Sequence, residues 1–452
     1  MPTGQRGYMM KTRIVPVAFK TRNEGFEGQV KHMTEVFSES VELLPEVELG
    51  NRLPEEADAV VFPQLLGEAY QRLEDFQRID RPILVITSEF GTMSMWDWEI
   101  MTFLRQNGVR TLAPYSIGQA EIMFRAARTR HELQGGKFLM YQDDPGEGQQ
   151  ASIFKRFWWW ENQCKQEMEE RFGVQLEYKS FKGLGERCAQ IENDSARKEW
   201  DRWDYPVEGL TDQAVCSAAK VYMAVKEDVQ RDDSIRGVGI NCLNESHFSD
   251  TTPCIAWNML FDEKGILWAC EGDILSLATE YLVYKSLEQP IMMTNVYPFL
   301  MGNAALKHER IPNFPEFVEN WEDHILVAHC GYFGLTPRSF AESWTLRPKV
   351  LEIVNEHSHA MDARWPTGPI TMVKLDPHMH KLMVVEGELK GYANYPDSDC
   401  LTGGVIEVDD GHEFMRNLYS HHQILVQGHQ YRNMQIIADV FGLEIETLQS
   451  GR

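Results

Sequence analysis

The sequence predicts an α/β protein in which two domains with parallel sheets precede a third, antiparallel and barrel-like β domain. In the first two thirds of the chain, short apolar runs alternate with stretches of helical periodicity, which is typical of strands joined by crossover helices. After about residue 293, strand-like runs follow one another with turn residues between them. The 452 residues suffice for two or three domains, which we place at 1–164, 165–292 and 293–452.

The first domain contains three apolar runs that we expect to be strands, at residues 13–18, 57–63 and 82–87. Helical patterns occupy residues 28–44 and 96–106. Because parallel strands need crossover connections, this order predicts a Rossmann-like sheet covered by helices.

Three consecutive tryptophans, Trp158, Trp159 and Trp160, follow Phe157 near the end of this domain. They cannot all face one side of a helix or strand, so at least one must point elsewhere. Large aromatic side chains are mostly buried in cores and interfaces, which favours a plug at a domain junction or a subunit contact. The alternative is a platform on which a sugar ring stacks.

The second domain carries two acidic islands at the ends of predicted strands. Glu245 follows an apolar run at 237–243, and Glu271 and Asp273 follow a second run at 265–270. Side chains at the carboxyl ends of parallel strands converge at one edge of the sheet. Paired carboxylates in such a place favour a functional site over solvated surface acids.

The third domain is predicted to be rich in β-structure. Its strand-like runs lie at residues 325–330, 368–375 and 381–388, and a helical pattern at 431–441 follows. Near the end, His421 and His422 precede an apolar run, so they fall on opposite faces of a strand. A neutral imidazole beside two acidic islands is a donor set that suits a divalent cation.

The composition excludes several classes of function. The formal net charge of −24 argues against binding to nucleic acid or to anionic membranes, both of which favour basic proteins. No apolar run approaches the roughly 18 residues of a membrane helix, and we find no signal peptide. The eight cysteines form no C-x-x-C pair and are expected to be free thiols in a reducing, cytoplasmic setting.

Four short motifs together resemble the L-fucose isomerase and L-arabinose isomerase superfamily, over about residues 235–450. They are W-A-C-E-G-D-I-L at 268–275, I-L-V-A-H-C-G at 325–331, G-P-I-T at 368–371, and S-H-H-Q at 420–423 with G-H at 428–429. The motifs occur in the family's order. The first third of the chain fits the family only in its pattern of strands and helices.

The resemblance implies a metal site, which the two branches of the superfamily build differently. The fucose isomerase pattern places the ligands at Glu245, Asp273 and His422. We predict this set as the metal site, with Glu245 and Asp273 also acting as the catalytic acid and base.

The arabinose isomerase pattern would instead use Glu271, His329, His422 and a further glutamate. That glutamate is absent, since Pro298 stands near its place and offers no side-chain ligand. Glu271 and His329 are therefore expected to contact the substrate or to support the ligands.

The family's activity implies isomerisation of an open-chain aldose and ketose through an enediol. A divalent cation, Mn²⁺ or else Co²⁺ or Mg²⁺, would stabilise negative charge on the oxygens at C1 and C2. The resemblance also implies a homo-oligomer, a trimer or hexamer. Two alternatives remain: an epimerase or isomerase for an unusual or anionic sugar, and a sugar-binding protein without catalysis.

Overall fold

The computed structural model describes residues 10–144, 156–243, 245–298, 318, 320–349, 357–395 and 401–447. The chain divides into two compact units, which are described separately below. The first comprises Met1–Glu132, Lys285–Glu288 and Arg432–Leu443; the second comprises Leu133–Tyr284, Gln289–Tyr431 and Glu444–Arg452. The predicted three-part division stays a prediction, since the central sheet and the barrel both fall in the second unit.

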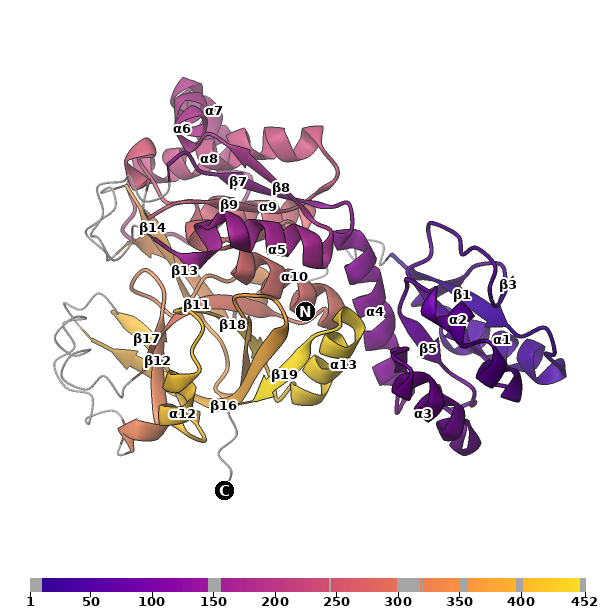
Figure 1. Ribbon diagram of the computed structural model, residues 1–452. Coiled ribbons are helices and arrows are strands. Elements are labelled where there is room, and N and C mark those ends of the chain that lie inside the picture. Colours follow the sequence, from indigo (N-terminus) through magenta and orange to yellow (C-terminus); the bar gives the residue numbers. More distant parts are fainter. Residues whose placement is uncertain are drawn as a thin grey trace. The chain divides into compact units, whose positions relative to one another are not determined.

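The first unit is built on a parallel sheet with the order β2-β1-β4-β5-β6 (Figure 1). Its strands are β1 (Thr12–Ala18), β2 (Val41–Leu43), β3 (Val47–Glu48, also paired with β1), β4 (Ala59–Phe62), β5 (Ile83–Val85) and β6 (Thr111–Leu112). Its helices are α1 (Glu24–Val36), α2 (Leu73–Gln77), α3 (Trp98–Gln106), α4 (Ile117–Leu133, which ends at the border of the unit) and α13 (Tyr431–Phe441, which begins there). The expected parallel sheet with alternating helices is confirmed for this part.

The helix expected at 28–44 is wrong at both ends. Helix α1 begins at Glu24, because the side chain of Asn23 accepts a hydrogen bond from Gly25 N and caps the helix. It ends at Val36, and Val41 begins strand β2, paired in parallel with β1. At residues 41–43, pairing with β1 therefore determined the structure, although the local sequence has a helical pattern.

The second unit contains a parallel sheet with the order β10-β9-β7-β8. Its strands are β7 (Lys137–Tyr141), β8 (Gln175–Lys179), β9 (Ile235–Ile240) and β10 (Leu267–Ala269). Its helices are α5 (Asn162–Phe172), α6 (Phe181–Gln190), α7 (Asn193–Trp200), α8 (Asp212–Arg231), α9 (Cys254–Lys264) and α10 (Ile274–Leu287, of which the last three residues belong to the first unit). Helices α6, α7 and α8 pack beside one another (Figure 1).

The same unit contains a closed antiparallel barrel. Within the described residues, six strands pair in the order β15-β18-β11-β12-β17-β16, and pairing of β15 with β16 closes the ring. The strands are β11 (Ile291–Pro298), β12 (His324–Ala328), β15 (Gly368–Leu375), β16 (Lys381–Asn394), β17 (Thr402–Val408) and β18 (His422–Gln427), with β19 (Glu444–Thr447) parallel to β16. The unit also contains helix α12 (Gly411–Arg416) and a separate two-stranded antiparallel sheet of β13 (Ser343–Pro348) and β14 (His359–Arg364). The predicted barrel is confirmed.

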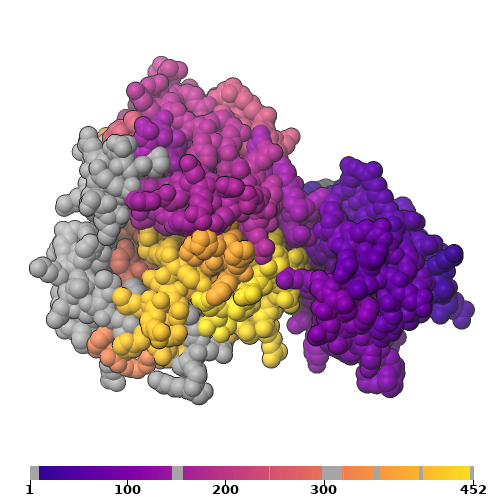
Figure 2. Space-filling view, in the orientation of Figure 1, coloured from indigo at the N-terminus to yellow at the C-terminus, as the bar shows by residue number. Residues whose placement is uncertain are grey.

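The segment that carries the central sheet lies directly against the segment that forms the barrel, as the magenta and the orange-to-yellow atoms of Figure 2 show. Strand β10 leads through the short 3-10 turn Cys270–Gly272 into α10. The barrel contributes residues of β15 and β18 to the same place. Among the described helices, none is both long enough and apolar enough to cross a membrane.

Candidate metal centre

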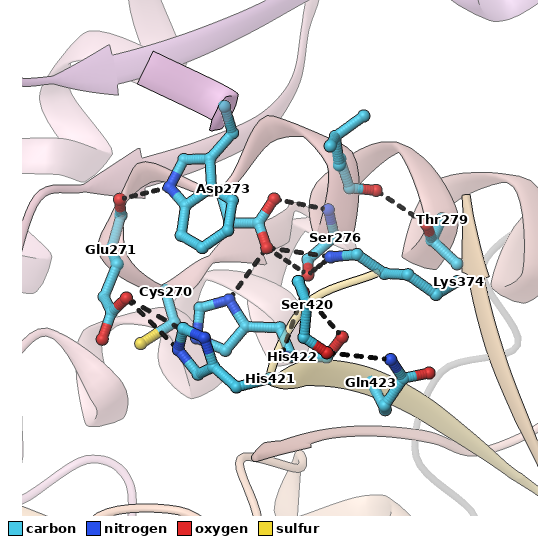
Figure 3. A network of polar contacts seen from close by, with 12 residues as sticks. Cys270, Glu271, Asp273, Ser276, Thr279, Lys374, Ser420, His421, His422 and Gln423 are labelled. Atoms are coloured by element: carbon cyan, nitrogen blue, oxygen red, sulfur yellow. Dashed lines mark hydrogen bonds and ion pairs between the residues drawn. The ribbon is translucent and has the colours of Figure 1, made fainter. Parts of the chain in front are cut away.

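Asp273 is the hub of a buried network between the central sheet and the barrel (Figure 3). Its carboxylate accepts hydrogen bonds from Lys374 Nζ at 2.9 Å and from the Ser276 backbone amide at 2.9 Å and hydroxyl at 2.7 Å. Both Asp273 and Lys374 are 0% exposed. Burial would raise the pKa of Asp273, but Lys374 and His422 outweigh it and hold that pKa below its ordinary value.

The same carboxylate fixes the ring of His422. Nδ1 of His422 lies 2.8 Å from Asp273 Oδ2, and the ring stacks on Trp159 with centroids 5.5 Å apart. Burial, together with neighbouring His421, lowers the pKa of His422 to about 4, so the imidazole is neutral near pH 7. With its proton on Nδ1, facing Asp273, the ring presents a lone pair at Nε2.

Glu271 faces that lone pair. Its Oε2 lies 3.8 Å from His422 Nε2 and 3.5 Å from His421 Nε2. Burial raises the pKa of Glu271, but the three histidines His421, His422 and His329 overcome this and lower it, so the carboxylate is charged. Glu271 Oε2 and His422 Nε2 are both buried, and neither has a hydrogen-bond partner among the described residues.

The backbone of Glu271 is held in an unusual conformation. Its φ is 53° and its ψ is 21°, in the left-handed region that costs a non-glycine residue roughly 1–2 kcal/mol. The indole N–H groups of Trp159 and Trp160 both donate to the Glu271 carbonyl oxygen, at 3.2 and 2.9 Å. The tryptophan run thus supports the turn that aims the Glu271 carboxylate at His422.

A thiol and a third imidazole stand beside this pair. One donor atom each from Cys270, Glu271 and His422 forms a buried group within 4.8 Å of one another. His329, which follows β12, places Nε2 3.3 Å from Cys270 Sγ. Oxygen, nitrogen and sulfur donors at these separations suit a borderline divalent cation such as Zn²⁺ or Co²⁺, whereas Mn²⁺ would be held chiefly by the carboxylate and the imidazole.

Glu245 lies elsewhere, against the end of β7. Its carboxylate accepts hydrogen bonds from the backbone amides of Asp143, at 3.0 and 3.1 Å, and of Asp144, at 2.5 Å. Burial raises the pKa of the Glu245 carboxyl to about 7, although the hydrogen bonds from these amides lower it. Among the described residues, no hydrogen bond or ion pair joins Glu245 to Asp273, Glu271 or His422.

The structure therefore brings Asp273 and His422 together, as a hydrogen-bonded pair, and adds Glu271 in place of Glu245. The ligand set predicted from the sequence, Glu245 with Asp273 and His422, stays a prediction. The side chain of Pro298, at the end of β11, lies outside the described residues. His421 faces Glu271 and packs 5.7 Å from the Phe157 ring.

Sequence reasoning missed the buried Lys374 and the thiol of Cys270. A signal for Lys374 was present, because it falls in phase with Ile370 and Met372 on an otherwise apolar strand. The seven described cysteines are free, as expected, and Cys400 lies outside the described residues.

A small cavity of about 200 Å³ adjoins His421. Its lining combines aromatic and aliphatic side chains with two basic residues, and it includes Arg156, Phe157, Trp158, Trp159, Lys374 and His421. Aromatic faces and a few polar groups are what a small polar ligand requires.

The protein-family models and the curated proteins with which we compared the sequence give no match.

Proposed function

We propose that the protein is a divalent-metal-dependent aldose–ketose isomerase that converts an open-chain sugar through an enediol. The observation that carries the proposal is the pair Glu271 Oε2 and His422 Nε2, two buried electron-pair donors that face each other at 3.8 Å. Two lone pairs this close repel unless a proton or a cation lies between them. Metal ligands at about 2.0–2.2 Å from a shared cation stand at similar separations.

Each residue of the network has a distinct part in this proposal. Glu271 and His422 hold the cation, with Cys270 as the third donor of the buried group. Asp273 is fully buried, and its carboxylate is held by Lys374, Ser276 and His422, so we assign it to orienting His422 rather than to touching the sugar. Lys374 keeps Asp273 ionised.

A bound divalent cation would supply charge stabilisation for the oxygens at C1 and C2 of the sugar. The chain must then move a proton between those two carbons. Glu245, with its pKa raised to about 7, remains our candidate for this transfer, because a general base works best when its pKa is near the working pH. The cavity beside His421, whose Nε2 lies 3.5 Å from Glu271 Oε2, is our candidate for the site of the sugar's end remote from the reacting carbons.

The second candidate is the same chemistry on an anionic sugar. Arg156 borders the cavity, and its side chain is 83% exposed. Its Nε pairs with Glu161 at 2.6 Å, and within the described residues its terminal nitrogens remain for a carboxylate or phosphate group.

The proposal is tested by a screen of the metal-stripped protein reloaded with Mn²⁺. Neutral, 6-deoxy and 6-charged aldoses and ketoses are incubated in D₂O and followed by NMR, with the Glu271→Gln variant as the inactive control. Conversion with deuterium at C1 or C2 supports an enediol, and conversion without it points to a hydride shift or a shielded proton. Failure to convert any sugar, while Mn²⁺ is bound, contradicts the proposal.

A further inference from the structure

Two cysteine thiols meet at the carboxyl ends of neighbouring strands. Strand β9 pairs in parallel with β10, with Gly239 opposite Ala269. Cys270 directly follows β10, and Cys242 lies two residues past the end of β9. The Cys242 amide donates to the Ile240 carbonyl at 2.8 Å, and this tight turn folds the chain back beside β10.

The sulfur atoms of Cys242 and Cys270 are 3.8 Å apart. A disulfide requires an S–S distance of about 2.05 Å. The two sulfurs can therefore bond only after a side-chain rotation and a small movement of the turn. Residue Cys242 is partly exposed whereas Cys270 is buried, so we take Cys242 as the thiol that meets an oxidant.

Cys270 also belongs to the buried donor group with Glu271 and His422. Its sulfur cannot keep a disulfide bond to Cys242 and act as a thiolate donor at the same time. Oxidation of the thiol pair would therefore change the donor atoms of the candidate metal centre.

We propose that Cys242 and Cys270 form a reversible disulfide that withdraws Cys270 from the cation-binding group. The effect on the cation rests on the proposed function, whereas the formation of the disulfide does not. With a peroxide as oxidant, the Cys242 thiol reduces one peroxide, releasing water and becoming a sulfenic acid. The Cys270 thiol then attacks that sulfur, and the S–S bond forms as a second water leaves. A dithiol reductant returns both thiols.

The first readout is the cross-link itself. The full-length protein is treated with hydrogen peroxide, digested without reduction, and analysed by mass spectrometry. We expect the peptide pair joined through Cys242 and Cys270, two hydrogens lighter than the separate peptides and absent after dithiothreitol. Cys188, a partly exposed thiol on α6, serves as the internal reference for peroxide reactivity. If Cys188 is oxidised and no Cys242–Cys270 peptide forms, the proposal is overturned.

The second readout is Co²⁺ affinity by calorimetry, before and after mild peroxide treatment, because Co²⁺ accepts a thiolate donor more readily than Mn²⁺ does. We expect a loss of about tenfold or more in the wild type, within the range reported when groups that support a metal site are lost. Dithiothreitol should restore it. The Cys242→Ser variant should keep its affinity under the same treatment, and Cys188→Ser should behave like the wild type.

The outcomes separate this proposal from the proposed function. If the reduced protein binds no Co²⁺, the proposed metal site fails, and the mass spectrum alone decides whether the thiol pair cross-links. If the cross-link forms and Co²⁺ affinity is unchanged, the control of the metal site is overturned while the isomerase proposal stands. Near-ultraviolet circular dichroism of Cys242→Ser verifies that the variant is folded.

Discussion

Replacing Lys374 with methionine removes the cation that neutralises Asp273 in the interior. At 2.9 Å and an effective dielectric constant of about 20, the Coulomb attraction between these groups is about 6 kcal/mol. Part of this offsets the cost of burying both charges, and breaking a buried pair on one side costs about 3–5 kcal/mol. We therefore expect Lys374→Met to lower the free energy of unfolding by about 3–5 kcal/mol in urea denaturation.

The double variant Lys374→Met with Asp273→Asn removes both charges and leaves no unpaired ion. We expect it to recover most of the stability lost by either single variant, because an uncharged pair of similar volume is often tolerated. Lys381→Met is the matched control, since Lys381 pairs with Glu446 at 2.7 Å with 45% of its side chain exposed. That surface pair should contribute about 0–1 kcal/mol. A cost below about 1 kcal/mol for Lys374→Met, equal to the control, would refute the reasoning.

Three further predictions concern other parts of the second unit. Burial and Lys349 lower the pKa of His359 to about 3, so its neutral form stabilises the fold above pH 6.5, and acid removes this stability as pH falls toward 3. The loss should reach about 3 kcal/mol by about pH 4.5 and be absent in His359→Gln, as chemical denaturation across pH measures. Trp160→Phe removes an indole donor to the Glu271 carbonyl and should weaken Mn²⁺ binding about tenfold in calorimetry. Gly185→Ala places a Cβ against the backbone oxygen of Phe248, next to Glu245, and should cost about 1–3 kcal/mol in urea denaturation.

Matched variants make these results interpretable. His380→Gln changes an exposed histidine and should keep the acid dependence of the wild type. Trp158→Phe removes an indole donor to Pro377 instead of Glu271 and should leave Mn²⁺ affinity unchanged. Gly183→Ala, on the same helix as Gly185, meets only the Ser180 side chain at 3.4 Å and should not destabilise the protein. Equal effects in a variant and its control would contradict the corresponding prediction.

Strands with a clear apolar run bounded by turn residues, such as β1, β4, β9, β15 and β16, were predictable from the sequence. Other strands were not predicted, among them β11, β17 and β7 (Lys137–Tyr141). In β7, Gly135 and Gly136 before the strand and the acidic residues after it give the segment the composition of a loop. Its two parallel neighbours, β8 and β9, bury it in the middle of the sheet. Such pairing partners come from distant parts of the chain and leave no local signal.

The candidate site was predictable only in part. Strand ends and motif order selected Glu245, Asp273 and His422 as ligands, and Glu271 only as a supporting or substrate-contacting residue, but they gave no distances. Asp273 and His422 are 149 residues apart in sequence, and their contact depends on how the barrel packs on the central sheet. Sequence spacing likewise did not reveal that Glu245 turns toward the amides at the end of β7.

We propose that a cation lies between Glu271 and His422, and calorimetric titration with Mn²⁺ tests this position. We expect Glu271→Gln to weaken binding by at least about a hundredfold. Glu245→Gln should bind like the wild type, because Glu271 faces His422 and Glu245 does not. Circular dichroism would show that both variants are folded. Loss of binding in Glu245→Gln with normal binding in Glu271→Gln would rule out this position and restore the ligand set predicted from the sequence.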